Sequence, residues 1–268
     1  MIVDKINAYL SQQGKTLDDS LRLEVEKLAG SVFKRQFMTA DEEVSKGLIR
    51  LSAVGRCTRQ VAYAFHGFEK AGKEIDARAK VVFWTGDLAE LTVVALAKLA
   101  GCTLMATGLQ QIAVKFAVNG ATISGHPDGI LLADKRLHLV EVKSMSSFSF
   151  ERFEKGYLDP SYIAQYNAYL EALGLDAVVY VALNKDAGVL SEKVFFKDNA
   201  VVAKIRANIQ TVLHSTPENL PAAPSEYDKD EKGIYPWNCR YCAYWKHCRP
   251  NAEEVLVKNA YKLKEKAA

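Results

Sequence analysis

Apolar positions repeat at helical spacing along much of the chain. Those between residues 4 and 28 are three, four or seven residues apart, which predicts one amphipathic helix that stops at Gly30. In the helix predicted at 160–174, Asp159 is a cap, Pro160 lies in the first turn and Gly174 follows the last apolar residue. The same periodicity predicts the remaining helices, at 52–66, 83–100, 199–215 and 251–266.

The spacing changes from helical to alternating in the middle of the chain. Residues 111–118 and 121–133 have the pattern of two hairpin strands joined by an Asn119-Gly120 turn. Further strands are predicted at 136–144, 176–184 and 191–197. This order of helices and strands indicates an α/β fold, a mixed central β-sheet flanked by helices.

Three regions are expected along the chain. Residues 1–48 form a helical N-terminal extension and residues 49–216 form the sheet-containing core. Residues 217–268 begin with a long irregular connection, since 217–237 holds four of the seven prolines, and continue into a cysteine-rich C-terminal segment.

Composition and charge limit the class of protein more than its function. The chain is 49% hydrophobic and 25% charged, as in ordinary globular proteins, and its net charge of +3 neither demands nor excludes a nucleic-acid partner. No stretch approaches the roughly 18 consecutive apolar residues of a membrane span, and no secretory signal is evident. We therefore expect a cytoplasmic protein without a membrane partner. In that reducing compartment, clustered cysteines hold metal more often than they form disulfides.

Two acidic residues stand out in the alternating region. Alternation along the strand at 136–144 places Glu141 and Lys143 on the face that carries two leucines. An isolated E-x-K of this kind is usually a strand end that emerges into solvent. Asp128, however, lies between two glycines late in an apolar strand, where aspartate is disfavoured and glycine leaves room for a ligand.

If these two strands are neighbours, Asp128 and Glu141 converge. Two carboxylates and a backbone carbonyl form the oxygen site that Mg²⁺ or Mn²⁺ prefers. Lys143 would then orient an attacking water or stabilise charge on a phosphate. On the helix at 160–174, Gln165 and Tyr169 share a face, either as ordinary packing residues or as a polar pair that contacts the lysine or a DNA strand.

Four short motifs follow one another along the chain, and together they resemble the PD-(D/E)XK nuclease superfamily, more narrowly its RecB-type exonuclease branch. The resemblance covers residues from about 50 to 250. The motifs are G-x-x-x-E at Gly86–Glu90, G-H-P-D at Gly125–Asp128, E-V-K at Glu141–Lys143 and Q-x-x-x-Y at Gln165–Tyr169.

This resemblance implies a role for each matching residue. Asp128 and Glu141 would bind the metal with the carbonyl of Val142, and Lys143 would be the catalytic lysine. Gln165 and Tyr169 would arrange that lysine and bind the nucleic acid. Two further metal ligands are less directly implied: Glu90, where many relatives carry histidine and which is otherwise a surface carboxylate, and His126, which is otherwise a polar strand residue.

The stretch NCRYCAYWKHC at 238–248 supplies three cysteines where metal centres usually need four ligands. A distant cysteine followed by C-x2-C-x5-C resembles the iron–sulfur nucleases of the same branch, including the CRISPR-associated exonuclease family. The resemblance implies that Cys57, Cys239, Cys242 and Cys248 hold a structural [4Fe-4S] cluster, although four thiolates also suit zinc. Cys102 lies in an apolar run and is predicted to be a buried structural residue.

The expected function is a Mg²⁺- or Mn²⁺-dependent DNA exonuclease that prefers single strands or ends, with protein partners in CRISPR adaptation or recombination. The alternatives are a zinc-stapled endonuclease and a nucleic-acid-binding adaptor with a vestigial nuclease centre. Residues 239–268 carry seven basic and three acidic residues. With the nearby aromatic residues they form either part of a single-strand path or a solvated basic helix.

Overall fold

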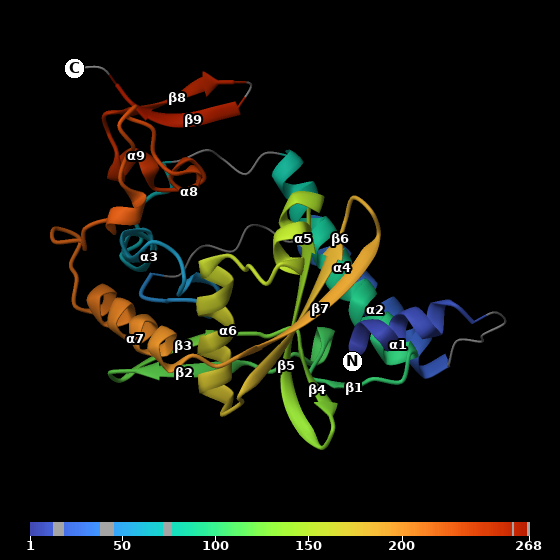
Figure 1. Cartoon of the computed structure of the whole chain (residues 1–268). Helices are drawn as coiled ribbons and strands as arrows, with labels where there is room; N and C mark the ends of the chain where they lie inside the picture. The colour runs from blue at the N-terminus through green and yellow to red at the C-terminus, as the bar shows by residue number, and fades with distance from the viewer. Residues whose placement is uncertain (13–18, 38–45, 72–76, 259, 267–268) are drawn as a thin grey trace.

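The computed structural model describes residues 1–12, 19–37, 46–71, 77–258 and 260–266 (Figure 1). Among these residues no helix has the length and hydrophobicity needed to cross a membrane. The helices are α1 Ile2–Leu10, α2 Asp19–Phe37, α3 Thr58–Phe65, α4 Ala77–Leu99, α5 Ser147–Glu154, α6 Pro160–Leu173, α7 Asn199–Leu213, α8 Trp237–Arg240 and α9 Trp245–Cys248. The strands are β1 Thr103–Met105, β2 Val114–Val118, β3 Ala121–Gly125, β4 Gly129–Ala133, β5 Arg136–Met145, β6 Ala177–Asn184, β7 Val189–Phe196, β8 Ala252–Val257 and β9 Ala260–Glu265.

The central sheet has five strands in the order β1-β4-β5-β6-β7. Strands β5 and β6 run parallel and the other neighbours run antiparallel. The helix α6 connects β5 to β6, as a parallel crossover requires. The α/β class with a mixed sheet between helices is thus confirmed, while α5 and β1 were not predicted from the sequence.

The two faces of the sheet carry different cores. One face, which includes Leu139 and Tyr180, packs with α3, α5, α6, α7 and the β2–β3 ribbon. The other face, which includes Val140 and Val142, packs with α1 and α4. Alternation along β5 therefore sends Glu141 and Lys143 to the α6 side, because they have the parity of Leu139.

The prediction of one strand over 121–133 is wrong. The turn at Asn119 and Gly120 is present, with both φ angles positive, and joins β2 to β3 in a separate two-stranded ribbon. Strand β3 then ends at Gly125, and β4 begins at Gly129 in the five-stranded sheet. Pro127 lacks a backbone N–H to donate to a ladder, so residues 126–128 connect the two sheets instead of continuing a strand.

The helix predicted at 4–28 is two helices, α1 and α2, and residues 13–18 between them lie outside the described part of the chain. Gly30 does not end a helix, because α2 continues to Phe37. A glycine inside a helix costs about 1 kcal/mol, which packing of a neighbouring residue such as the buried Val32 can offset. Helix α1 packs directly on the sheet through Ile2, Val3 and Ile6.

The C-terminal helix predicted at 251–266 is also wrong. Strands β8 and β9 form an antiparallel hairpin there, and the burial pattern explains why: Leu263 is fully buried while Lys262 and Lys264 are exposed. Together α8, α9, β8 and β9 form a small unit, called the C-terminal unit below, which lies beside α3 in Figure 1. Its core is small, consisting of Tyr235, Trp245, Ala252 and Leu263.

Candidate active site

The structure brings Asp128, Glu141 and Lys143 together at the junction of β4 and β5. Gly129 pairs with Val140, so Asp128 comes just before the paired residues and lies beside Glu141. The Lys143 Nζ atom is 2.8 Å from Glu141 Oε2 and 3.6 Å from Asp128 Oδ2. Asp128 also accepts a hydrogen bond from the Val142 backbone N–H at 2.7 Å. One ammonium group thus links the two carboxylates on the α6 face of the sheet.

Glu141 is held in an unfavourable environment. Its side chain is 2% exposed, and its Oε1 atom has no hydrogen-bond partner among the described residues. Burial raises the pKa of Glu141 to about 7 although Lys143 opposes the shift. Burial also disfavours the charged form of Lys143, but Asp128 and Glu141 together hold the lysine pKa well above its usual value. A buried carboxylate oxygen without a donor is chemically suited to a cation.

Helix α6 closes one side of this site. The Tyr169 hydroxyl donates a hydrogen bond to the backbone carbonyl of His126 at 3.2 Å. Burial, together with the charge of Glu141, raises the pKa of Tyr169 to about 12, and a hydrogen bond with the Gln165 side chain opposes the shift. Tyr169 therefore lies close to the carboxylates, with Gln165 bonded to it, and a role for this pair in the site stays a prediction.

Tyr180 is a site residue that sequence reasoning missed. It lies on β6 directly opposite Glu141, and its buried hydroxyl has no hydrogen-bond partner among the described residues. Its ring centroid is 6.3 Å from that of Tyr162, which in turn lies 5.8 Å from Lys143 Nζ. In the sequence Tyr180 stands within a continuous apolar strand, so only the register with β5 identifies it.

Glu90 and His126 lie differently from the other predicted ligands. The Glu90 Oε1 atom accepts a hydrogen bond from Gln111 Nε2 at 2.9 Å. The His126 side chain is exposed. Within the described part of the chain, no group of three or more His, Cys, Asp or Glu side chains is arranged to hold a metal ion, so Glu90 does not complete such a group. A ligand role for Glu90 or His126 stays a prediction.

The structure also gathers four of the five cysteines around one cavity. The cavity is lined by Cys57, at the start of α3, and by Cys239, Cys242 and Cys248 of the C-terminal unit. Cys102 is buried elsewhere, in the core that includes α1 and α4. All five thiols are free. The four share a cavity without forming a ready-made ligand group, as stated above for the described residues.

The chemistry of these thiols suits a soft metal centre. Burial, helped by the neighbouring thiols, raises the pKa of Cys239 to about 12 and that of Cys242 to about 11. The proximity of Arg249 opposes the shift at Cys239. Without a metal Cys239 and Cys242 are therefore protonated, whereas a bound soft metal would deprotonate them. A set of four sulfur donors fits an iron–sulfur cluster or zinc.

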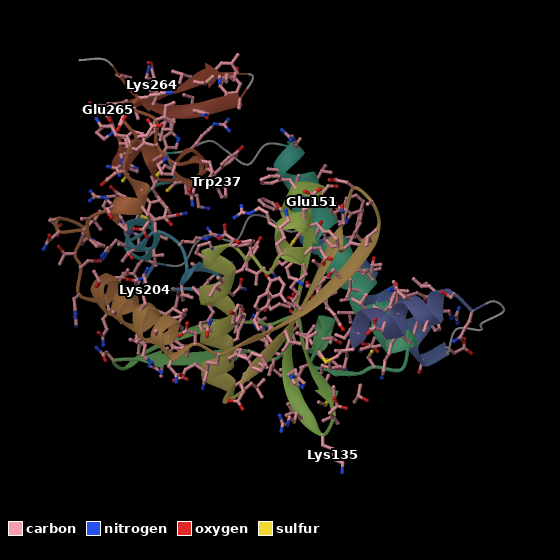
Figure 2. All side chains as sticks on the ribbon, viewed as in Figure 1. Lys135, Glu151, Lys204, Trp237, Lys264 and Glu265 are labelled. Atoms are coloured by element: carbon pink, nitrogen blue, oxygen red, sulfur yellow. The ribbon has the colours of Figure 1, made fainter. Side chains whose placement is uncertain are left out.

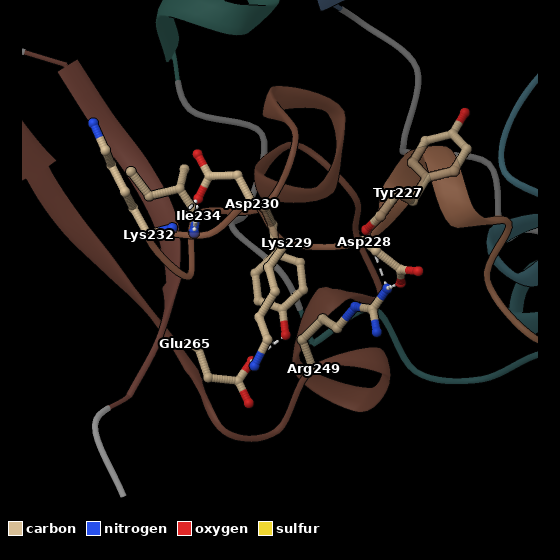
Figure 3. Close-up of polar contacts among 9 residues, drawn as sticks. Tyr227, Asp228, Lys229, Asp230, Lys232, Ile234, Arg249 and Glu265 are labelled. Atoms are coloured by element: carbon tan, nitrogen blue, oxygen red, sulfur yellow. Dashed lines mark hydrogen bonds and ion pairs between the residues drawn. The ribbon is translucent and has the colours of Figure 1, made fainter.

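Arg249 lines the same cavity and is fixed by the connection that precedes the C-terminal unit (Figure 3). Its Nη2 atom donates to the Tyr227 carbonyl at 3.1 Å and lies 3.4 Å from Asp228 Oδ1. Its guanidinium lies 4.8 Å from the Tyr235 ring centroid. The buried Nε–H has no hydrogen-bond partner among the described residues. A positive charge and a spare donor thus stand beside the four thiols.

Comparison with known proteins places this geometry in context. A family model described as the PD-(D/E)XK nuclease superfamily matches residues 21–249, and no curated protein matches the chain. The crystal structure of SSO0001 is similar at 18% identity, covering 83% of this chain and 94% of that one, with a TM-score of 0.52.

An alkaline exonuclease, LHK-Exo from Laribacter hongkongensis, is similar at 17% identity, covering 70% of this chain and 90% of its own, with a TM-score of 0.46. The structure of LHK-Exo in complex with dAMP gives 17% identity, 69% and 90% coverage, and a TM-score of 0.46. The family match includes the carboxylate site and the three clustered cysteines as well as Cys57.

Proposed function

Because this chain belongs to the PD-(D/E)XK nuclease superfamily, we propose that it is a metal-dependent DNA exonuclease that hydrolyses phosphodiester bonds and prefers single strands or ends. The observation that carries the proposal is the meeting of Asp128, Glu141 and Lys143 around a buried carboxylate oxygen that has no donor in the described part of the chain. An adaptor with a vestigial centre would have no reason to keep that unfavourable arrangement.

Asp128, Glu141 and the Val142 carbonyl would hold Mg²⁺ or Mn²⁺, which when bound neutralises the carboxylates and polarises the scissile phosphate. Lys143 supplies a second positive charge, fixed between the two carboxylates before substrate arrives. Its ammonium, which keeps its proton, can stabilise negative charge that develops on the phosphate or orient the attacking water.

The residues around this centre position it. Tyr169 ties α6 to the connection that carries Asp128, so the helix fixes the carboxylate relative to β5. Gln165 hydrogen-bonds the Tyr169 side chain and would help to hold it in place. Tyr180 offers a free hydroxyl opposite Glu141 and acts as a positioning residue for the water or phosphate. These groups together exclude solvent from one side of the reacting phosphate.

The second half of the proposal is a structural [4Fe-4S] cluster held by Cys57, Cys239, Cys242 and Cys248. What supports it is that one cavity joins a cysteine at α3 with three from the C-terminal unit. Because the core of that unit is small, a metal centre that links the unit to α3 would stabilise it. Four thiolates carry negative charge, which Arg249 would offset from its fixed place at the cavity wall.

The experiment is a time course with single-stranded DNA labelled at one end, with and without Mn²⁺. We expect Mn²⁺-dependent release of mononucleotides or short products, faster than from a duplex with blocked ends. Glu141→Gln and Lys143→Met should each lower the cleavage rate by roughly hundredfold or more, since each removes a charged group from the site. Lys204→Met, at an exposed lysine of α7, serves as the control.

The other outcomes of this experiment are informative. Binding of DNA without cleavage under any divalent cation would point to the adaptor, and cutting of closed circular DNA would point to an endonuclease. Full activity of both Glu141→Gln and Lys143→Met would overturn the proposed site. Zinc in place of iron and sulfide in anaerobically purified protein would replace the cluster by a zinc staple.

A further inference from the structure

The C-terminal unit exposes large aromatic side chains that a protein normally covers. Trp237 is 67% exposed, Tyr241 is 70% exposed and Tyr261 is 58% exposed. Two other aromatic residues of the same segment, Tyr244 and Trp245, are buried and belong to its interior. The aromatic residues around the cysteines thus divide into an inner set that packs and an outer set that faces solvent.

The guanidinium group of Arg240 contacts two rings of the outer set, and the third ring contacts one of these two. Arg240 lies over the Tyr241 ring at 4.9 Å and over the Tyr261 ring at 5.6 Å. The rings of Trp237 and Tyr241 meet edge to face with centroids 6.1 Å apart. We call these four residues, Trp237, Arg240, Tyr241 and Tyr261, the aromatic platform. It joins α8 to β9, two elements that lie in contact.

The platform is fixed before any partner arrives. Arg240 Nε donates to Glu254 Oε1 at 2.7 Å, and Arg240 Nη1 donates to the Tyr241 hydroxyl at 2.9 Å. The arginine side chain is only 14% exposed, so its position is determined by these contacts. Rigid rings lose little conformational entropy on binding, which favours a surface of this kind as a recognition site.

We propose that the aromatic platform is a binding site for single-stranded nucleic acid, in which unpaired bases stack on Trp237 and Tyr241. Two observations favour this occupant over a protein. Residues 239–268 carry seven basic against three acidic residues, a charge that complements a phosphate backbone. Flat rings beside an arginine match the stacking surfaces that take up single strands without regard to sequence.

The place of the platform agrees with the proposed nuclease function, on which this inference rests in part. In the view of Figure 2, Trp237 projects from the C-terminal unit in the direction of α5, where Glu151 is labelled. Helix α5 directly follows β5, the strand that carries Glu141 and Lys143. A strand stacked on the platform would therefore lie on the side of the C-terminal unit that is turned toward the nuclease core. The platform would capture substrate away from the reacting phosphate.

The test measures binding without cleavage. Fluorescence anisotropy of a labelled oligo-dT of about 20 nucleotides is recorded with the whole chain in EDTA. We expect Trp237→Ala and Tyr241→Ala each to weaken binding about tenfold, as the loss of one base stack does. Trp237→Phe should retain most of the affinity. Phe196→Ala, at an aromatic residue that is 70% exposed on β7, should leave affinity unchanged.

A duplex of the same length should bind less tightly and should not respond to Trp237→Ala, because its bases are already stacked on one another. Equal affinity of the alanine variants and the unaltered chain for oligo-dT would overturn the inference. So would an equal loss for oligo-dT and duplex, since that pattern indicates charge or folding and not stacking.

A small phosphodiester, bis(p-nitrophenyl) phosphate with Mn²⁺, separates this inference from the proposed activity. It is a single phosphodiester without a nucleic-acid strand to be captured, so the platform variants should hydrolyse it at the unaltered rate. If the unaltered chain fails to hydrolyse either this ester or DNA, the proposed nuclease activity fails, while the anisotropy result still decides the binding site.

Discussion

At the scale of single residues, the fold buries the Glu141 carboxylate in a place that favours its neutral form. Glu141 is buried, one oxygen bonds Lys143 and the other has no donor among the described residues. A cation would supply the missing partner, and without it the buried charge is costly. Such local conflict is typical of functional sites, where stability is exchanged for chemistry.

Glu141→Gln is expected to stabilise the chain in a pH-dependent way. The folded pKa of Glu141 lies near 7, above its unfolded value, so the folded state holds the proton more tightly. The stability contributed by that proton is complete at pH values below the unfolded pKa and is lost as the pH rises through about 7. Thermal unfolding in EDTA should show a larger gain for Glu141→Gln at pH 8 than at pH 5. An equal gain at both values would contradict this account.

Tyr180→Phe should separate catalysis from folding. Removing a buried hydroxyl that has no partner costs little stability or improves it slightly, within about 1 kcal/mol. If the hydroxyl positions the water or phosphate, kcat should fall about tenfold while KM for DNA stays unchanged. Tyr166→Phe is the matched control, because this buried tyrosine of α6 stacks on Phe195. A loss of activity in both variants, or in neither, would refute the role of Tyr180.

At the scale of elements, local signals determined what could be predicted. Helix α6 was predicted with its ends because Asp159 and Pro160 mark its first turn and Gly174 its last, and the structure has the cap bond and the left-handed Gly174. Strand β5 also followed from alternation, whereas Asp128 was expected beside Glu141 only if the two strands are neighbours, which the structure shows. The hairpin β8–β9 was missed because Leu263 is buried by Tyr235 and Trp245, and the local pattern does not indicate that contact.

Replacement by alanine should change the stability of the chain in opposite directions at two glycines that begin family motifs. A Cβ at Gly125 would lie 2.7 Å from Leu51 Cβ and 2.8 Å from the Tyr169 hydroxyl, so Gly125→Ala should destabilise by about 1–3 kcal/mol and displace Tyr169. A Cβ at Gly86 in α4 would meet nothing within 4 Å, so Gly86→Ala should stabilise by about 0.5–1 kcal/mol. Urea unfolding measures the change in the free energy of unfolding for both variants, provided that the m-value stays constant. A neutral or stabilising effect of Gly125→Ala would show that the close approach at Gly125 is not structurally required.

At the scale of the whole molecule, the cavity joins parts of the chain that lie far apart in the sequence. Cys57 precedes the central sheet, and the other three cysteines follow it. No periodicity or spacing could reveal that pairing. The family resemblance suggested Cys57, and the apolar run around Cys102 argued against Cys102. The structure separates the two residues: Cys57 lines the cavity and Cys102 lies in the core beside α1.

Cys57→Ala should therefore abolish binding of the metal centre as completely as Cys242→Ala does. Iron and acid-labile sulfide, measured per chain after anaerobic purification, should fall to background in both variants. Both should also lose thermal stability, because the small C-terminal unit would no longer be tied to α3. Cys102→Ala is the matched control and should retain its iron. Full iron content in Cys57→Ala would refute the proposed ligand set.

The connection at residues 126–128 has a mechanical consequence. It carries Asp128 and links two sheets, the β2–β3 ribbon and the five-stranded sheet, with only three residues. Arg206 of α7 binds the ribbon by donating a hydrogen bond to the Ala117 carbonyl at 2.7 Å. Because the link is so short, a displacement of the ribbon or of α7 is expected to reach Asp128 and its spacing from Glu141. A movement of the β2–β3 ribbon would thus alter the geometry of the carboxylate site through this connection.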